Sequence, residues 1–371
     1  MSRVKNRRVT AGWSGAAAVA LLFGLTASSE AATAGVSTPG KYADSSRLFV
    51  MAAPGERNHI VLTNTADGIR VMDAQPVIAG AYCESQPDGS AVCREVPHTP
   101  RLQGVYVGLG DLDDSARAQF DLPVGTRLSG GAGDDVLTAS QNSPTTFLGG
   151  DGDDVMTGGS WADLFLEGSA PNGSDSMEAG SLGPNRPLDA FFHADEVSYA
   201  DRDNPIRADL EGDPDDGERG ERDQIGSDVE SIEGGAGGDT LVGDENANSL
   251  NGGHGADLLI GSEGDDRLIG GPRADKSADR LSGGEGLDYL YGGGGDDRMR
   301  GGPSRDELRG GEGRDVVRGG TGQDVIYGGP GNDLLRTRDG LIEAIFCGGG
   351  FDRFVGDRLE QLTDCERRLR A

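Results

Sequence analysis

The sequence has few of the residues that fill a conventional globular core. Aromatic residues make up 5% of the 371 positions and hydrophobic residues 35%, which is too little apolar volume for one large core. Basic residues are also scarce, with 34 Lys and Arg against 63 Asp and Glu, so the formal net charge is -29. A chain of this charge repels itself unless cations compensate it, and it is a poor partner for nucleic acid. These shortages favour a thin, repetitive core and bound cations.

The motifs of common secreted enzymes are missing as well. The sequence contains neither the His-Glu-x-x-His zinc-protease motif nor a Gly-x-Ser-x-Gly nucleophile elbow, and it has no EF-hand loop. Only four histidines occur, and they form no cluster, which argues against a zinc site. They are His59, His98, His193 and His254. We predict no catalytic residues.

One group of residues could still support polysaccharide chemistry on an exposed face of a β-helix. It consists of Asp189, His193, Asp195 and Tyr199. An ordinary structural strand that carries a repeat aspartate explains these residues more simply.

The N-terminal residues have the pattern of an export signal. Basic residues between Arg3 and Arg8 precede the apolar run 16–25, and the small residues 32–34 follow it. The apolar run is shorter than the roughly 20 residues of a membrane span. We therefore expect a cleaved signal peptide at residues 1–34, an extracellular protein and no transmembrane segment. The pattern does not decide between the Sec and twin-arginine export routes.

The cysteines fall into two local pairs. Cys83 and Cys93 flank the turn sequence Gln-Pro-Asp-Gly-Ser, and Cys347 and Cys365 lie near the C-terminus. An even number of cysteines in an exported chain predicts disulfide bonds, and neither pair has the spacing of metal ligands or of a redox motif. We therefore expect the disulfides Cys83–Cys93 and Cys347–Cys365.

A short glycine-rich repeat dominates much of the chain. Gly-Gly-x-Gly-x-Asp is followed, two positions after the aspartate, by an apolar residue. The six-residue pattern begins at nine positions: 130, 149, 234, 252, 283, 292, 310, 319 and 328. From Asp279 to Asp333 the aspartates recur every nine residues. A flexible linker would not keep this phase, so the repeat predicts a regular solenoid.

Each part of the repeat has a physical reason. Glycines permit a sharp turn whose carbonyl groups point inward, and the three residues that follow form a minimal strand with its middle side chain in the core. Carboxylate and carbonyl oxygens are the ligands that Ca²⁺ prefers. Ordering nine residues costs more conformational entropy than one buried apolar side chain returns, so we expect the repeats to fold only when ions bind.

The pattern resembles the RTX (hemolysin-type) calcium-binding nonapeptide family, over residues 130–178 and 234–336 and more loosely to Asp352. The resemblance implies an all-β fold, a calcium-stabilised parallel β-roll or β-solenoid, and an exported bacterial calcium-binding protein. It also implies that several Ca²⁺ ions lie between stacked turns, shared by the aspartates of repeats n and n+2. The implied metal ligands are Asp135, Asp154, Asp163, Asp239, Asp257, Asp266, Asp279, Asp288, Asp297, Asp306, Asp315, Asp324 and Asp333.

Some repeats depart from the pattern, and each departure weakens one expected site. Four extra residues fall within 270–282, so either Asp275 or Asp279 could be the ligand there. We prefer Asp279 because an apolar residue follows it at the right distance. Between Gly168 and Asp175 the spacing slips by three residues, which predicts a bulged coil. Three positions lack the expected residue: Trp161 and Ser304 replace glycine, and Asn248 replaces aspartate.

These features divide the chain into six parts. Short β-type runs separated by turn residues predict a small β structure before the repeats, and both ends of a solenoid need closing. The expected parts are a signal peptide (1–34), an N-terminal β cap with the Cys83–Cys93 pair (35–103), a first repeat block (104–180), inserted strands with an acidic loop (181–233), a second repeat block (234–346) and a C-terminal cap with the Cys347–Cys365 pair (347–371).

Three functions compete on the sequence alone. We favour a secreted, non-enzymatic calcium-binding protein with a structural role or an association with a cell-surface or matrix polymer. The first alternative is an extracellular enzyme that acts on polysaccharides, built on a calcium-binding β-helix. The second is a toxin-like protein, which rests on the analogy of fold alone.

Overall fold

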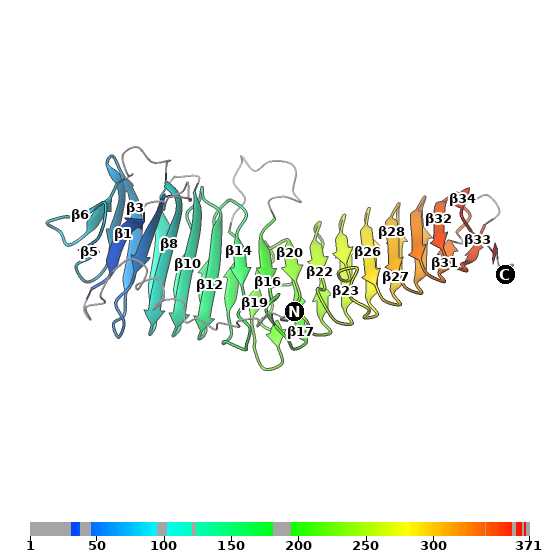
Figure 1. The fold of residues 1–371 in the computed structure, drawn as a ribbon, viewed down its shortest axis with the longest axis horizontal. Helices are drawn as coiled ribbons and strands as arrows, with labels where there is room; N and C mark the ends of the chain where they lie inside the picture. The colour runs from blue at the N-terminus through cyan, green and yellow to red at the C-terminus, as the bar shows by residue number, and fades with distance from the viewer. Residues whose placement is uncertain are drawn as a thin grey trace, which may run out of the picture.

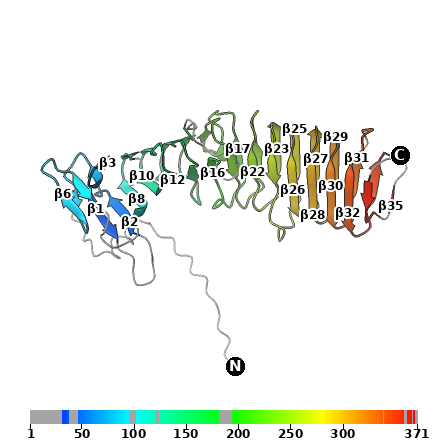
Figure 2. The same ribbon diagram turned by 90° about the horizontal axis from the view of Figure 1, so that it is seen from above.

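The structure is a computed structural model that describes residues 31–37, 46–94, 102–120, 124–180, 194–337, 339–357, 361–365 and 367–368. In these residues the chain forms an elongated solenoid whose strands stack side by side along the long axis (Figures 1 and 2). No helix occurs in the described ranges, so none there could cross a membrane. The predicted all-β parallel solenoid is confirmed. The basic and apolar parts of the predicted signal peptide lie outside the described residues.

One wall of the solenoid is a sheet of 16 strands, here called the long sheet, which runs from one end to the other. Its strands are β1 (Thr33–Ser37), β2 (Ser46–Met51), β5 (Ile78–Ala79), β8 (Leu102–Asp111), β10 (Gly125–Ala132), β12 (Thr145–Asp151), β14 (Leu164–Leu166), β16 (Glu196–Ser198), β20 (Ser231–Glu233), β22 (Ser249–Asn251), β24 (Arg267–Ile269), β26 (Tyr289–Gly294), β28 (Glu307–Glu312), β30 (Val325–Pro330), β32 (Ala344–Gly349) and β34 (Gln361–Thr363).

The other wall consists of two shorter sheets. The N-terminal short sheet contains β3 (His59–Thr65), β4 (Gly68–Met72), β6 (Cys83–Ser85), β7 (Ala91–Cys93), β9 (Ser115–Gln119), β11 (Val136–Thr138), β13 (Val155–Thr157), β15 (Ser176–Glu178) and β19 (Gln224–Ile225). The C-terminal short sheet contains β17 (Ile206–Asp209), β18 (Gly217–Glu218), β21 (Thr240–Val242), β23 (Leu258–Glu263), β25 (Arg280–Glu285), β27 (Arg298–Pro303), β29 (Val316–Thr321), β31 (Leu334–Thr337), β33 (Arg353–Gly356) and β35 (Arg367–Arg368).

Successive repeats alternate between the two walls, so two nonapeptides make one coil. Leu290 of β26 pairs in parallel with Leu308 of β28 in the long sheet, and Met299 of β27 pairs with Val317 of β29 in the opposite wall. Both pairs are eighteen residues apart, as two nonapeptides require. In the repeats, the apolar residue two positions after each aspartate points inward and is buried, because successive side chains of a strand face opposite sides. The core is therefore a thin double row of apolar residues.

The predicted insertion 181–233 is the place where the wall opposite the long sheet changes, which we call the sheet switch. Strands β16 and β20 continue the long sheet through it without a break. In the other wall, β19 is the last strand of the N-terminal short sheet, and β17 begins the C-terminal short sheet with β18 as an antiparallel edge. The described part of this segment, residues 194–233, thus belongs to the solenoid itself.

The solenoid begins earlier than the predicted start at residue 104. Strands β2 and β3, which fall in the predicted N-terminal cap, already run parallel to β8 and β9 and form a coil with them. The antiparallel strands β1, β4, β6 and β7 close the first edge. The predicted signal-peptide boundary at residue 34 falls inside β1, where Ala32 and Ala34 are buried.

In the described residues after position 347, the chain continues the solenoid with another coil. Residue 347, the expected boundary, lies within β32, and β34 and β35 pair in parallel with β32 and β33. Both expected disulfides are present, Cys83–Cys93 between β6 and β7 and Cys347–Cys365 from β32 to the last coil. Each disulfide therefore fastens one end of the solenoid.

Replacing Cys347 and Cys365 together by Ala is expected to loosen the last coils. The bond closes a loop of eighteen residues, and a crosslink of this length stabilises a fold by about 3 kcal/mol. Amide hydrogen exchange in saturating calcium should speed up in β31 to β34 and stay unchanged near β8. The same substitution of Cys83 and Cys93 is the control, and it should leave the exchange of the C-terminal coils as it was. Equal exchange in both variants would contradict the prediction.

Candidate calcium sites

The repeat aspartates form columns along the edges of the solenoid. Each repeat aspartate directly precedes a strand, so the glycine-rich turn places it at the edge of a coil. The backbone N–H of Asp279 donates to Oδ1 of Asp297 at 2.9 Å, and the N–H of Asp297 donates to Oδ1 of Asp315 at 2.9 Å. One carboxylate oxygen of each member is thus occupied by the coil before it. All thirteen predicted ligands are 1 to 3% exposed.

There are three such columns in the described residues, one for each sheet. The N-terminal column contains Asp114, Asp135, Asp154, Asp175 and Asp223. The long-sheet column contains Asp163 before the sheet switch, Asp195 within it, and Asn248, Asp266, Asp288, Asp306 and Asp324 after it. The C-terminal column contains Asp239, Asp257, Asp279, Asp297, Asp315, Asp333 and Asp352. The structure therefore brings every predicted ligand into one of three lines.

The second carboxylate oxygen is what makes these columns candidate metal sites. In most of the predicted ligands that the structure describes, Oδ2 is buried and has no hydrogen-bond partner. These are Asp135, Asp154, Asp257, Asp266, Asp288, Asp297, Asp306, Asp315, Asp324 and Asp333. A buried polar atom without a partner lowers the stability of the fold. Because the same oxygen is unpartnered in coil after coil, we expect the same kind of ligand to bind at each one. A row of cations would satisfy these oxygens.

The glycine turns bring a column carboxylate close to a carbonyl group of the next coil. A methyl group placed on Gly270 would lie 2.5 Å from Oδ2 of Asp279 and 2.6 Å from the carbonyl oxygen of Gly292 in the next coil of the long sheet. A methyl on Gly234 would meet Asp239 and the carbonyl of Gly252 in the same way. Carboxylate and carbonyl oxygens are the ligands that Ca²⁺ prefers. The donor set therefore fits calcium, and only glycine is tolerated here because a side chain would clash with both oxygens.

Burial also changes the acidity of the columns. It raises the pKa of Asp257 and Asp315 to about 7 and that of Asp279 to about 8. For Asp279 the neighbouring carboxylates Asp297 and Asp257 add to the effect, because like charges disfavour ionisation. A cation in the column must therefore displace protons near neutral pH.

The structure also decides the ambiguous positions. Asp279 stands in the C-terminal column, whereas Asp275 lies outside it, accepts hydrogen bonds from Gly255 and Ser277 and pairs with His254. Asp175 occupies its column despite the slipped spacing. At position 248 the amide oxygen of Asn248 accepts the N–H of Asp244, so this turn holds a neutral side chain.

Five column aspartates were not among the predicted ligands: Asp114, Asp175, Asp195, Asp223 and Asp352. Asp114 follows Leu109–Asp113, which resembles half a repeat, and Asp352 ends the looser continuation, so both had a sequence signal. Asp223 sits at the end of an acidic loop, 48 residues after its partner Asp175, and nothing in the repeat pattern indicates it.

Alanine in place of Gly270 is expected to remove the ion that Oδ2 of Asp279 and the carbonyl oxygen of Gly292 would share. The new methyl group would clash with Oδ2 of Asp279 and with the backbone carbonyl oxygen of Gly292, which cannot move aside without shifting the next coil. Gly349 is the matched control, since a methyl there meets nothing within 4 Å. Calcium titration by calorimetry should show fewer bound ions for Gly270→Ala and no change for Gly349→Ala. Equal stoichiometry in all three proteins would refute this assignment.

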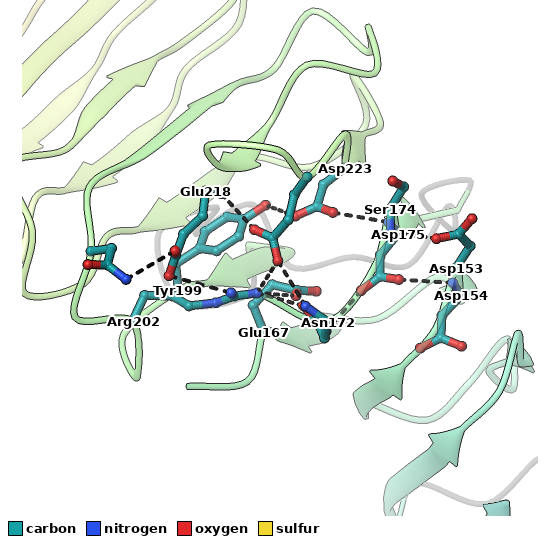
Figure 3. A network of polar contacts seen from close by, with 12 residues as sticks. Asp153, Asp154, Glu167, Asn172, Ser174, Asp175, Tyr199, Arg202, Glu218 and Asp223 are labelled. Atoms are coloured by element: carbon teal, nitrogen blue, oxygen red, sulfur yellow. Dashed lines mark hydrogen bonds and ion pairs between the residues drawn. The ribbon is translucent and has the colours of Figure 1, made fainter. Parts of the chain in front are cut away.

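A buried ionic network lies at the sheet switch (Figure 3). Arg202 is fully buried, and its Nη2 lies 3.2 Å from Oε2 of Glu167 and 3.0 Å from Oε1 of Glu221. Nη1 lies 3.6 Å from Oε1 of Glu218. Burial alone would lower the pKa of Arg202, but the carboxylates of Glu221 and Glu167 raise it, so the guanidinium stays charged. This cation compensates the carboxylates where one short sheet gives way to the other.

The same network ends the N-terminal column. The hydroxyl of Tyr199 donates to Oδ2 of Asp223, the last member, at 3.0 Å. Asn172 donates from its side chain to Oδ2 of Asp175 at 3.1 Å and accepts from Arg202 at 2.6 Å. Oδ2 of Asp175 and of Asp223, the last two aspartates of the column, therefore accepts a hydrogen bond from a side chain. The Oδ2 atoms of Asp135 and Asp154 have no such partner.

The group considered for polysaccharide chemistry is not supported. Asp189 and His193 lie outside the described residues. Tyr199 is completely buried in the network, and Asp195 is buried in the long-sheet column, where it accepts the N–H of Asp163 at 2.6 Å. Neither side chain can reach a polymer outside the molecule.

One acidic cluster lies outside the columns. Asp209, Asp215 and Asp216 bring carboxylate oxygens together beside the acidic loop. Arg207 pairs with Asp209 at 3.1 Å and Asp215 at 2.8 Å, and both oxygens of Asp216 accept backbone N–H groups. Protein groups thus already contact all three carboxylates.

Comparison with known families agrees with this geometry. The sequence matches the family model of the RTX calcium-binding nonapeptide repeat (4 copies) in residues 126–142, 146–163, 233–268, 273–308 and 300–335. No curated protein matches the chain. The matched ranges cover much of both repeat blocks and include most of the aspartates in the columns.

Proposed function

The chain belongs to the RTX calcium-binding nonapeptide repeat family, and on that premise we propose that it is a secreted, non-enzymatic protein whose solenoid folds on several Ca²⁺ ions and serves as an extracellular scaffold that associates with a surface or matrix polymer. The observation that carries the proposal is the repeated buried Oδ2 atom without a partner, facing a glycine whose side chain would fill the space.

We assign the ions to the three columns. The ligands would be carboxylate oxygens of the thirteen predicted aspartates, in most of them the unpartnered Oδ2, together with carbonyl oxygens of the glycine turns in the next coil. Bound Ca²⁺ supplies the positive charge that offsets the stacked carboxylates, and the protein supplies the dehydrated oxygen cage. The departures at position 248 and at the sheet switch should lower the number of ions below one for each repeat.

Export and a structural role are further parts of the proposal. The N-terminal signal pattern and the two disulfides support an extracellular location, since disulfides persist in oxidising compartments. We place the signal cleavage before Ala32, because Ala32 and Ala34 pack in the core at β1. The coils of the solenoid extend over most of the described residues, which favours a scaffold over an enzyme.

Calcium titration of the mature protein tests the proposal. Calorimetry should detect several ions, and circular dichroism should show the β signal rising over the same range of calcium. Magnesium is the control ion, because it demands a tighter octahedral geometry. A protein that neither binds millimolar Ca²⁺ nor changes its spectrum would refute the proposal.

A further inference from the structure

The outer face of the C-terminal short sheet carries a dense group of arginines in an otherwise acidic protein. On strands β25, β27, β29, β31 and β33, the two residues that flank the buried middle side chain face outward. Six of these residues are arginine, four are uncharged and none is acidic. We call the six the arginine face: Arg280, Arg298, Arg300, Arg318, Arg336 and Arg353. The uncharged residues are Ser282, Val316, Leu334 and Val355.

The arginines of this face are stacked directly on one another. Arg300 is the Cα partner of Arg318, and Arg318 is the partner of Arg336. Arg280 and Arg298 form another such pair. Neighbouring strands lie about 4.8 Å apart, and like charges directly opposite each other destabilise a sheet. The sequence therefore keeps an arrangement that costs stability in the isolated protein.

None of the six arginines forms an ion pair in the described residues, and all six are exposed. The pKa of Asp296 is lowered mainly by Arg314, with which it forms an ion pair at 2.6 Å. Arg298 adds only a small electrostatic contribution to this shift. The guanidinium groups thus keep their donors available. A partner from outside the chain could take them.

In the long sheet, on the opposite wall of the solenoid, two arginines contact acidic or aromatic side chains. Arg309 on β28 pairs with Glu307 at 2.6 Å, and its guanidinium lies over the rings of Tyr289 and Tyr327. Arg267 likewise lies 4.9 Å from the ring centre of Tyr289. These arginines are held by their own wall, in contrast to the arginine face.

We propose that the arginine face binds a linear polysaccharide that carries regularly spaced carboxylates. A guanidinium group recognises a carboxylate with two parallel hydrogen bonds. A straight row at strand spacing fits an extended polymer whose sugar units have about the same length. The proposal rests on the proposed function, because the rows exist only when the coils are folded.

The charge of the rest of the protein favours a sparsely charged polymer over nucleic acid. Acidic columns and turns border the face, and the whole chain carries a net charge of -29. A nucleic acid strand has one phosphate about every 3.4 Å, so its dense charge would be repelled by these edges. A polysaccharide with one carboxylate on every second sugar meets the row of arginines at a lower cost.

Binding of hyaluronan fragments to the calcium-saturated mature protein tests this inference. Hyaluronan has one carboxylate for each pair of sugars and no sulfate. The triple variant Arg300→Gln/Arg318→Gln/Arg336→Gln removes one row. Exposed ion pairs contribute about 0.2 to 1 kcal/mol each, so we expect its affinity to fall on the order of tenfold, with a weaker dependence on salt. The matched control Arg219→Gln/Arg222→Gln/Arg305→Gln makes the same change in charge outside the face and should bind like the parent.

Several results would overturn the proposal. They are an equal loss in the control variant, equal binding of neutral dextran, tighter binding of single-stranded DNA, or no binding of hyaluronan. Circular dichroism in calcium is measured on every variant. If the parent protein folds with calcium and yet ignores hyaluronan, the surface assignment is wrong and the proposed calcium scaffold stands. If the parent protein does not respond to calcium, the proposed function itself fails.

Discussion

Removal of calcium by a chelator at pH 8 is expected to unfold the solenoid, with loss of most of its β signal in circular dichroism. At this pH most of the buried aspartates in the columns are ionised, because the pH exceeds their pKa values. Burial raises the pKa of Asp257 and Asp315 to about 7 and that of Asp297 to about 6, so pH 8 leaves them charged, stacked and without a cation. Self-repulsion then adds to the conformational entropy of a chain with a thin core.

Acidification in the same chelator should restore part of the structure. A carboxyl group whose pKa is higher in the folded state than in the unfolded state stabilises the fold when it is protonated. Its contribution is complete below the unfolded value of about 3.8. It is lost as the pH rises through the folded values, which lie at about 6 for Asp297, about 7 for Asp257 and about 8 for Asp279. The β signal without calcium should therefore be larger at pH 4 than at pH 8.

Calcium binding should show the opposite dependence on pH. Protons compete with Ca²⁺ for the same buried oxygens, so the apparent affinity should fall as the pH is lowered from 8 to 6, and binding should release protons. Calorimetry in two buffers of different ionisation enthalpy measures that release. Full β structure at pH 8 in excess chelator, or an affinity that does not change between pH 8 and 6, would contradict the role that we give to the columns.

The repeat made much of this fold predictable. A period of nine fixes the eighteen-residue register, because two turns and two strands complete one coil, and the structure pairs Leu290 with Leu308 accordingly. The same phase placed Asp279, and not Asp275, in its column. The two disulfides followed from the local spacing of the cysteines. Local periodicity was sufficient to predict the strand register and the column positions wherever the coil length stayed constant.

The parts that could not be predicted depend on contacts between distant residues. The first coil pairs Val50 with Val107 and Ile60 with Ala116, each across more than fifty residues without a repeat between them. Asp223 joins its column across an acidic loop, where the sequence shows only polarity. The role of Arg202 depends on four segments that meet at the sheet switch. Pairings of this kind are set by packing, which a single sequence does not display.

Replacing Arg202 by Met is expected to destabilise the calcium-bound protein by about 3 to 5 kcal/mol, the usual cost of leaving buried charges without their partner. Arg202 is the cation that neutralises Glu167, Glu218 and Glu221 at the sheet switch, and burial already raises the pKa of Glu167 to about 7. Denaturant unfolding in saturating calcium measures the loss. We further expect the loss of this network to uncouple the coils on the two sides of the sheet switch. These two groups of coils should then unfold in separate transitions.

Arg207 provides the matched control on the same segment of the chain. Its side chain is 57% exposed and pairs with Asp209 and Asp215, so Arg207→Met should cost less than about 1 kcal/mol, as surface ion pairs do. Adding Glu167→Gln to Arg202→Met should recover part of the stability, because it removes one of the uncompensated carboxylates. A loss below about 1 kcal/mol for Arg202→Met, or no recovery in the double variant, would show that the network does not hold the two short sheets together.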